Sequence, residues 1–555
     1  MKPIMRPEWV MRFRSQACRA PSAPTSLLSV ALVCALLLTG CSDNASTTYG
    51  SSPEIVARVT ISDGELEGSV VGGARQFLGI PFAKPPVGDL RFKLPQKNDP
   101  WRSKRDATQW GNRCAQRASA VLMSAASEHE DCLYLNVWAP EPAPAEPLPV
   151  MVWIHGGGNE NWSASEPVPY ASDGYLYSGQ VLAESGVVVV SVNYRLGVFG
   201  FLADPVLARE GGSNPGNQGL FDQVMALEWV KNNIADFGGD PNRVTIFGQS
   251  AGATDVCFHV ASPITRPFFR AAIGQSGGCT LRTTTAAEGA ATAAGFAHAL
   301  GCDDIACLRG KSVSELLATP NDGSPAPVFG PVVDGVFLPD QPRALYDRGE
   351  IAKVPYLLGS NSDEGTMFFT RPITDAREYT AALVEAFPRA GETSADSGER
   401  VQPIEAMYPV RAFPNGQPTP TTAAVARVIG DARLVCPTYD TAVRAAAAGS
   451  PVWMYNFSIG ASRGGLGAAH GSELPFVFGT AESFEPLMQA VAERIQRYWI
   501  NMAQSGNPNR GDDTDWPRFS GAAPVRLDIG ATDNTVFDFR VKECEFWRGV
   551  YDRGL

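Results

Sequence analysis

The chain has 555 residues, of which 44% are hydrophobic and 19% are charged, a balance typical of an ordinary globular protein. Its formal net charge is -12 at pH 7, and residues 1–40 contain five Lys/Arg and only one Glu, so the remainder is more acidic still. Such an acidic surface repels phosphate backbones, so we expect no nucleic-acid partner.

Residues 1–40 have the features of an export signal. A basic region precedes an apolar run at 27–38, which at roughly 12 residues is too short to anchor in a bilayer. The run ends in Leu38-Thr39-Gly40-Cys41, which resembles the lipobox of bacterial lipoproteins. We therefore expect cleavage before Cys41 and a lipid on its thiol; the alternative is a plain secretory signal with a chance cysteine.

The residues after the cleavage point refine this expectation. Ser42 stands where an aspartate would indicate retention in the inner membrane, so the outer membrane or periplasm of a Gram-negative bacterium is favoured. Residues 41–54 are small and polar and are expected to form a flexible tether. The membrane is thus an expected partner, reached through the lipid on Cys41.

The cysteines agree with export. Of eleven, Cys18 and Cys34 lie in the signal and Cys41 follows it, which leaves an even number in an oxidising compartment and indicates disulfides. Their connectivity does not follow from the sequence, although the short spacing of Cys302 and Cys307 favours a local loop.

Residues 55–555 are expected to form a single α/β domain. Short antiparallel strands separated by glycines come first, at 56–62, 65–71 and 76–80. An alternating strand follows at 133–138, and buried apolar strands are expected at 150–154, 187–192, 244–247, 354–358 and 452–457. Helical spacing of apolar residues covers 220–237, and a long helix is expected at 485–504. This alternation predicts a large, mostly parallel twisted sheet flanked by helices.

Residues 248–252 read Gly-Gln-Ser-Ala-Gly, a G-x-S-x-G pentapeptide between a buried strand and a helix. A serine at such a junction adopts a strained turn, which presents the Ser250 hydroxyl above the sheet. The flanking backbones approach so closely that both ends of the pentapeptide must be glycine. The amide of Ala251, at the start of the helix, would point at a developing oxyanion. The alternative is an ordinary glycine-rich turn.

Three glycines, Gly156, Gly157 and Gly158, follow His155 directly after the strand at 150–154. Backbone without side chains can expose successive amides, as an oxyanion hole requires. Alone, this segment could be a loop beside any ligand. Its pairing with G-x-S-x-G in the same strand–turn context favours the oxyanion hole.

A serine nucleophile needs a base, and the base needs a carboxylate to hold it. Where a G-x-S-x-G turn follows a strand, the chain order is serine, acid, histidine, and only His470 lies far enough downstream. Of the other histidines, His155 belongs to the glycine loop, and three are expected to be structural or at the surface: His129, His259 and His298. The acid stays open between Asp363 and Glu364, which both follow the strand at 354–358, and both could be solvated loop charges.

Two long segments resemble the type-B carboxylesterase/lipase family, which includes the cholinesterases. Residues 237–252 resemble its serine signature, and residues 130–140 resemble its second signature. Shorter matches lie at 193–197, 470–476, 506–509 and 516–517. The resemblance runs from about residue 55 to the C-terminus. It implies an α/β-hydrolase fold and ester hydrolysis through an acyl-enzyme.

Carried over position by position, the resemblance makes Ser250 the nucleophile, Glu364 the acid in preference to Asp363, and His470 the base. It places the oxyanion hole on the amides of Gly157, Gly158 and Ala251. It also implies disulfides between Cys114 and Cys132, between Cys436 and Cys544, and between Cys302 and Cys307. A bond between the remaining Cys257 and Cys279 is left open.

Three positions depart from the family. Gln249 replaces the usual glutamate before the serine, which removes a charge near the site without touching the triad. The loop 114–132 lacks the tryptophan with which cholinesterases hold a quaternary ammonium, so choline esters are not expected as substrates. Asn159 replaces an aromatic residue after the three glycines and is expected to widen or polarise the acyl side of the pocket.

The sequence therefore predicts a serine carboxylic ester hydrolase that acts on a small-molecule ester. No cofactor is expected, and His and Cys show no zinc spacing. A lipase or amidase using the same residues is one alternative. A non-catalytic, cholinesterase-like binding protein is another, and the intact Ser250, Glu364 and His470 weigh against it.

Overall fold

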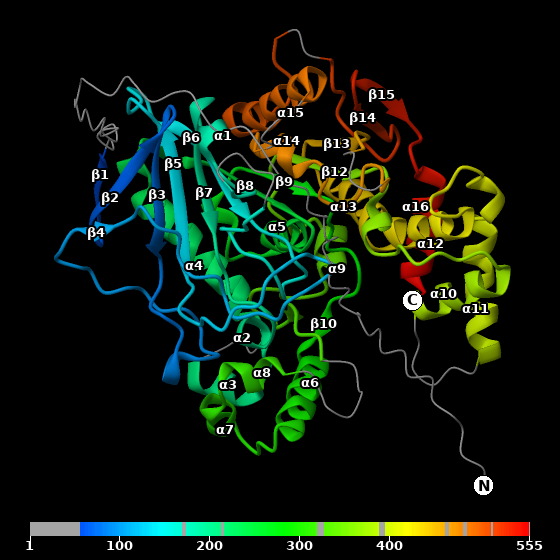
Figure 1. Ribbon diagram of the computed structural model, residues 1–555, viewed down its shortest axis with the longest axis horizontal. Coiled ribbons are helices and arrows are strands. Elements are labelled where there is room, and N and C mark those ends of the chain that lie inside the picture. Colours follow the sequence, from blue (N-terminus) through cyan, green and yellow to red (C-terminus); the bar gives the residue numbers. More distant parts are fainter. Residues whose placement is uncertain are drawn as a thin grey trace, which may run out of the picture. The chain divides into compact units, whose positions relative to one another are not determined.

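The centre of the protein is a sheet of 13 strands, which Figure 1 shows running from β1 at one edge to β15 at the other. The computed structural model describes residues 56–168, 174–211, 216–318, 327–387, 394–460, 465–480, 485–511 and 514–553. The predicted signal, its lipidated Cys41 and the tether lie outside these residues.

The sheet has the order β1-β2-β3-β5-β7-β6-β8-β9-β12-β13-β14-β15, with β4 paired to β2. Its antiparallel beginning consists of β1 (Val56–Ile61), β2 (Gly64–Val71), β3 (Ala74–Pro81) and β5 (Tyr134–Pro140). Seven neighbouring strands then run parallel: β7 (Val188–Val192), β6 (Leu148–Ile154), β8 (Gly239–Gln249), β9 (Ala271–Gln275), β12 (Tyr356–Asn361), β13 (Val452–Phe457) and β14 (Val525–Ile529). The remaining strands are the antiparallel edge β15 (Asn534–Phe537), the short β4 (Arg105–Asp106) and the separate pair β10 (Thr284–Thr285) and β11 (Val332–Val333).

Helices cover both faces of the parallel part because both faces of its strands are apolar. In β6, Met151 and Trp153 belong to one apolar cluster, while the alternate residues Val150 and Val152 belong to the other. The Trp153 face packs on α1 (Gln180–Glu184), α14 (Leu474–Phe478) and α15 (Pro486–Ser505). The Val152 face packs on α4 (Gln218–Asn233), α5 (Ala251–Ala261), α9 (Pro342–Asp347) and α13 (Cys436–Ala447).

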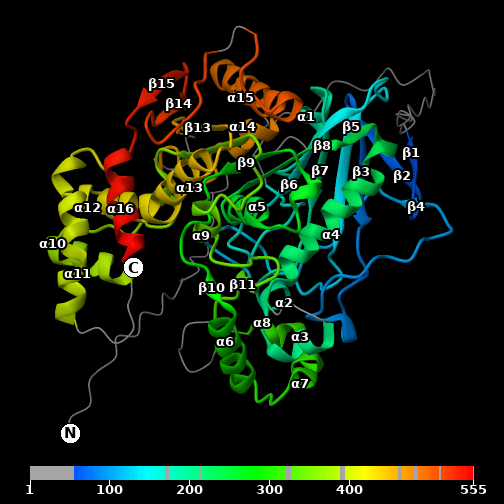
Figure 2. The ribbon, with the colours of Figure 1, turned by 180° about the vertical axis from the view of Figure 1, so that it is seen from behind.

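The other helices gather in two groups beside the sheet, as Figures 1 and 2 both show. One group consists of α10 (Ala376–Ala386), α11 (Ser394–Met407), α12 (Pro420–Gly430) and α16 (Val541–Asp552). The second consists of α3 (Pro205–Gly211), α6 (Ala286–Ala299), α7 (Ile305–Gly310) and α8 (Val313–Leu317), with α2 (Gly197–Phe201) close to the sheet. None of the helices in the described ranges combines the length and apolarity that a bilayer-spanning segment needs.

The fold class predicted from the sequence is confirmed, with small differences at the strand ends. The strand expected at 354–358 begins only at Tyr356 and continues to Asn361, because Pro355 has no amide hydrogen for a ladder bond. The parallel strand β14 was not predicted, and neither was β9. The sequence of β9, Ala-Ala-Ile-Gly-Gln, has little of the β-branched character that marks a strand.

Four disulfides are present, with Cα–Cα distances from 4.7 to 5.7 Å: Cys114–Cys132, Cys257–Cys279, Cys302–Cys307 and Cys436–Cys544. The pair that the sequence left open, Cys257 and Cys279, is thus bonded in the structure. The widest loop is closed by Cys436–Cys544, which joins α13 to α16 across a separation of 108 residues.

Candidate active site

Ser250 lies in a strained turn between β8 and α5. Its backbone has φ 59° and ψ −125°, a conformation that non-glycine residues rarely adopt. The turn is tight: a Cβ atom added to Gly248 would lie 2.5 Å from the carbonyl oxygen of Gly252, and one added to Gly252 would meet the carbonyl oxygens of the strand end at Ile154. Side chains at either glycine would therefore open the turn that carries the serine.

His470 and Glu364 form a buried pair close to this turn. His470 Nδ1 lies 2.6 Å from Glu364 Oε2, and the two side chains are 3% and 0% exposed. Glu364 opens the short helix η4 (Glu364–Met367) after β12, and its other oxygen accepts a 2.7 Å hydrogen bond from the amide of Asn361. A carboxylate that receives the Nδ1 hydrogen fixes the tautomer in which Nε2 carries a lone pair, as a general base requires.

Asp363, the alternative acid, is directed elsewhere. Its carboxylate pairs with Arg427 at 3.1 Å and accepts the amide hydrogen of Ala468 at 3.0 Å. Asp363 therefore fastens the loop that carries the histidine to α12, while its neighbour Glu364 contacts the imidazole. The residues alone left the choice between these two adjacent carboxylates open. In the structure, the chain after β12 directs Glu364, and not Asp363, toward the imidazole.

The side chain of Gln249 is hydrogen-bonded to the second imidazole nitrogen of His470, Nε2. Its side-chain nitrogen lies 3.1 Å from His470 Nε2, and its side chain is buried. Within the described residues, no hydrogen bond joins the Ser250 hydroxyl to His470. The Gln249 side-chain amide thus donates to the same Nε2 lone pair that the Ser250 hydroxyl would use. The sequence predicted only that glutamine in place of glutamate removes a charge near the site, and not this contact.

The glycine loop after β6 lies against the turn at Ser250. A Cβ atom on Gly156 would lie 2.7 Å from the carbonyl oxygen of Gln249 and 3.0 Å from Cβ of Ser250. Gly157 and Gly158 follow with φ values of 100° and 70°. Across the described ranges, neither of these two amides donates a hydrogen bond, and Ala251 is the first residue of α5, where an amide has no partner inside the helix. All three amides are free to bind a ligand oxygen.

Asn361 and Glu473 support the pair, and neither was given a role by the sequence. The Asn361 side chain donates to Glu473 Oε2 at 2.6 Å and to the carbonyl of Ala469, next to the histidine, at 2.8 Å. Burial, and then the charge of Glu364, raise the pKa of Glu473. Glu473 lies within the family match after His470, but its contact with Asn361 has no local sequence signal because the two residues lie 112 positions apart.

The remaining histidines have no part in this arrangement. His155 and His259 are fully buried, and burial lowers their pKa values to about 4 and about 3, so both are neutral. His129 and His298 are exposed, the latter on α6. The expectation that His129, His259 and His298 are structural or at the surface agrees with their positions.

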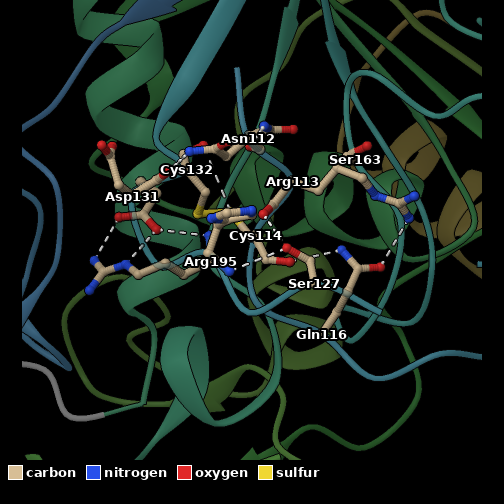
Figure 3. Close-up of a disulfide and its surroundings, with 12 residues drawn as sticks. Asn112, Arg113, Cys114, Gln116, Ser127, Asp131, Cys132, Ser163 and Arg195 are labelled. Atoms are coloured by element: carbon tan, nitrogen blue, oxygen red, sulfur yellow. Dashed lines mark hydrogen bonds and ion pairs between the residues drawn. A yellow bond between two sulfur atoms is a disulfide. The ribbon is translucent and has the colours of Figure 1, made fainter. Parts of the chain in front are cut away.

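The Cys114–Cys132 loop is fastened to the segment that follows the three glycines (Figure 3). Gln116 donates to the carbonyl of Trp162 at 2.9 Å and accepts from its amide at 2.8 Å. Arg113 pairs with the buried Glu166 at 3.1 Å, and burial raises the pKa of Glu166 from its ordinary value of 4.5 to about 7. These contacts hold the loop against the segment that follows the three glycines.

Asn159, directly after the three glycines, is buried and hydrogen-bonded. It is 5% exposed, its side-chain nitrogen donates to Asp255, and its side-chain oxygen accepts from the hydroxyl of Tyr194. That it widens or polarises the acyl side of the pocket stays a prediction. Phe368 is 40% exposed and its ring centroid lies 5.2 Å from that of His470, which leaves it available to contact a substrate.

No group of side chains suited to holding a metal ion occurs among the described residues. A cavity of about 360 Å³ lies behind the acid, lined by residues that include Asp363, Glu364 and Arg427. Neither Ser250 nor His470 is among the residues that line it.

Fold and site together define a class. A mostly parallel sheet, a serine in a strained turn after β8, and an acid and a histidine from later loops are the arrangement of an α/β-hydrolase that cleaves esters. The sequence profile of the carboxylesterase family matches residues 56–547, and the chain belongs to that family. It is a serine carboxylic ester hydrolase.

Two relatives show how far this similarity extends. The chain is 34% identical to a cholinesterase of Mus musculus over 549 residues, which cover 90% of this chain and 87% of that protein. It is 36% identical to a fumonisin B1 esterase of Sphingopyxis macrogoltabida over 483 residues, which cover 82% of this chain and 83% of the relative.

Proposed function

We propose that the protein hydrolyses carboxylic esters through an acyl-enzyme formed on Ser250, with His470 as the base and Glu364 as the acid. The observation that carries the proposal is the 2.6 Å contact between buried His470 and Glu364 beside a serine in a strained backbone conformation. Strain at a non-glycine residue persists only where the surrounding structure enforces it, and it is typical of active sites.

The reaction begins with an exchange at His470. The Gln249 amide must release Nε2 so that the Ser250 hydroxyl can donate to the same lone pair. Ser250 then attacks the ester carbonyl as His470 takes its proton, and the imidazolium is stabilised by Glu364. His470 returns the proton to the leaving alcohol, and a water activated by the same nitrogen then releases the acid.

The tetrahedral oxyanion is bound by the amides of Gly157, Gly158 and Ala251. These groups are fixed before the substrate arrives, so they stabilise charge without reorganising, and each such donor contributes on the order of 10²–10³ in rate. The absence of a tryptophan from the 114–132 loop argues against choline esters, so the proposal concerns other carboxylic esters.

The test is to label the purified protein with a fluorophosphonate and to map the adduct by mass spectrometry. The proposal expects a single adduct, on Ser250, that is absent from Ser250→Ala. An adduct on another residue, or unchanged ester turnover by Ser250→Ala, would refute it.

We also propose that the enzyme is exported, cleaved before Cys41 and anchored by a lipid on that cysteine, on the outer membrane or facing the periplasm of a Gram-negative bacterium. The support is the sequence Leu-Thr-Gly-Cys after a basic region and an apolar run. Metabolic labelling with an alkyne fatty acid tests this: the full chain should incorporate the label and Cys41→Ser should not. Labelling of the Cys41→Ser variant would contradict the proposal.

A further inference from the structure

A buried polar network joins the glycine loop to the helix that follows the serine. Asn159, directly after the three glycines, donates its side-chain amide to Asp255 Oδ1 at 3.1 Å. Asp255 lies on α5, five residues after Ser250, and its second oxygen accepts from Gln223 of α4 at 2.7 Å. Both members of the central bond are buried, Asn159 at 5% exposure and Asp255 at 0%.

Tyr194 completes the network on the other side of the loop. Its hydroxyl lies 2.8 Å from the carbonyl oxygen of His155 and 2.9 Å from the side-chain oxygen of Asn159, so it reaches both ends of the glycine segment. Its ring stacks on that of His155 with centroids 4.5 Å apart. The three residues Asn159, Asp255 and Tyr194 are called the loop clamp below.

The loop clamp is costly to bury, which argues that it does more than fill space. Asp255 has neutral amides as its two hydrogen-bond donors, and no salt bridge reaches it within the described part of the chain. Burial raises its pKa to about 7, against the opposing effect of the Gln223 and Asn159 bonds. A buried carboxylate without a cation is destabilising compared with an apolar side chain, so its presence here points to a compensating role.

The position of the clamp suggests that role. Gly157 and Gly158 lie on one side of the Asn159–Asp255 bond, and Ala251 lies on the other, at the start of the same helix as Asp255. We propose that the loop clamp positions the oxyanion hole by fixing the distance between the glycine amides and the amide of Ala251. This inference rests on the proposed function, because it concerns how that site binds the transition state.

A positioning role predicts a specific kinetic effect. Amides displaced by a fraction of an ångström still admit the substrate but bind the tetrahedral oxyanion less well, so kcat should fall while KM changes little. For Asp255→Asn and Asn159→Asp we expect kcat to fall about 10- to 100-fold with KM within about threefold of the wild type. Affinity for a trifluoromethyl ketone, which forms a tetrahedral adduct, should fall in parallel.

The exchanged double variant, Asn159→Asp with Asp255→Asn, is the decisive test. In it, the new carboxylate at position 159 would accept from Tyr194 and from the new amide at position 255, whose oxygen would accept from Gln223. Every bond of the clamp is thereby restored, with the central one reversed in direction. We expect the double variant to recover kcat to within about threefold to tenfold of the wild type. Tyr194→Phe keeps the ring stack, removes the hydroxyl, and should reduce kcat several-fold, which keeps the test open if a single variant fails to fold.

Two controls separate the outcomes. Asp533→Asn removes a buried carboxylate that is bonded to Arg494 and Tyr498, away from the serine turn and the glycine loop, and should lower stability without changing kcat. Ser250→Ala in the same assay tests the proposed function on its own. The inference is overturned, and the clamp is only structural, if the clamp variants lose stability but keep kcat and ketone affinity. It is also overturned if the exchanged double variant has no higher kcat than the single variants. In either case, loss of turnover in Ser250→Ala would still support the proposed ester hydrolysis.

Discussion

Replacing Glu364 by glutamine tests the roles of the acid and the base together. In the wild type, one carboxylate oxygen accepts from the amide of Asn361 at 2.7 Å and the other meets His470 Nδ1 at 2.6 Å. A carboxamide has one acceptor only, and the backbone amide of Asn361 cannot turn away from it. Leaving that amide opposite an NH₂ group would cost about 1–3 kcal/mol. The glutamine should therefore point its NH₂ group at His470.

An NH₂ group facing Nδ1 selects the tautomer with its hydrogen on Nε2, which cannot accept the Ser250 proton. The side-chain oxygen Oε1 of Gln249 is buried and has no hydrogen-bond partner among the described residues. Rotation of the Gln249 amide would let this oxygen accept the Nε2 hydrogen and stabilise the wrong tautomer further. We expect kcat for p-nitrophenyl acetate to fall about 10⁴-fold in Glu364→Gln, which corresponds to about 5 kcal/mol of transition-state stabilisation. Residual activity should remain, because the free amides of the glycine loop are untouched.

The matched control is Asp363→Asn, one position earlier. Asp363 pairs with Arg427 and the amide of Ala468 and does not contact the imidazole, so its replacement should change kcat less than about tenfold. Steady-state kinetics with both variants, together with thermal unfolding to show that both are folded, decide the matter. The reasoning would be refuted if Glu364→Gln stayed within tenfold of the wild type, or if Asp363→Asn were the more damaging change.

Three further predictions follow from single contacts. Gln249→Glu would place a carboxylate beside His470 Nε2 and favour the imidazolium, so the acidic limb of the kcat/KM profile should move to higher pH; an unmoved limb would contradict the contact. Replacing Cys436 and Cys544 by alanine should lower the free energy of unfolding by about 4–5 kcal/mol, against about 2 kcal/mol for Cys302 and Cys307, because the closed loops span 108 and 5 residues; equal losses in urea titrations would count against it. Because the pKa of Glu166 is raised to about 7, the native state holds a proton that the unfolded chain loses near pH 4.5, so this group makes stability fall as pH rises between those values. From pH 5 to pH 8, the free energy of unfolding should therefore fall less in Glu166→Gln than in the wild type, the difference being on the order of 1–3 kcal/mol. The same dependence of stability on pH in both proteins would exclude the effect.

The sequence predicted the parts of the site that depend on local geometry. Close backbone contacts leave no room for a Cβ atom at the two glycines beside Ser250, Gly248 and Gly252, or at Gly156 and Gly157 after His155. Gly158 has open space around it, and its positive φ of 70° is what favours glycine there. Five of the seven parallel strands could be predicted because both of their faces are buried, which makes strands such as β6, β7 and β13 continuous apolar runs. The other two, β9 and β14, lack such a run. Such signals are short-range and survive in a single sequence.

The contacts between distant side chains could not be predicted in the same way. Whether Asp363 or Glu364 meets His470 depends on how β12 ends, and only the family resemblance favoured Glu364. The sequence flagged Gln249 and Asn159 as departures, but it gave no sign that one binds the imidazole and the other a carboxylate 96 residues away. Pairs of this kind are set by packing between elements and leave no periodic pattern.

The most direct test of the account is rapid-quench kinetics with p-nitrophenyl acetate, combined with mass mapping of the acid-quenched protein. The account predicts a burst of p-nitrophenol in proportion to the enzyme, with the acetyl group on Ser250 during turnover. If deacylation proves too fast for a burst, the acetyl group should still be trapped on that residue by quenching at early times. Turnover without any acyl group on Ser250, or with the acetyl group on a different side chain, would contradict the account.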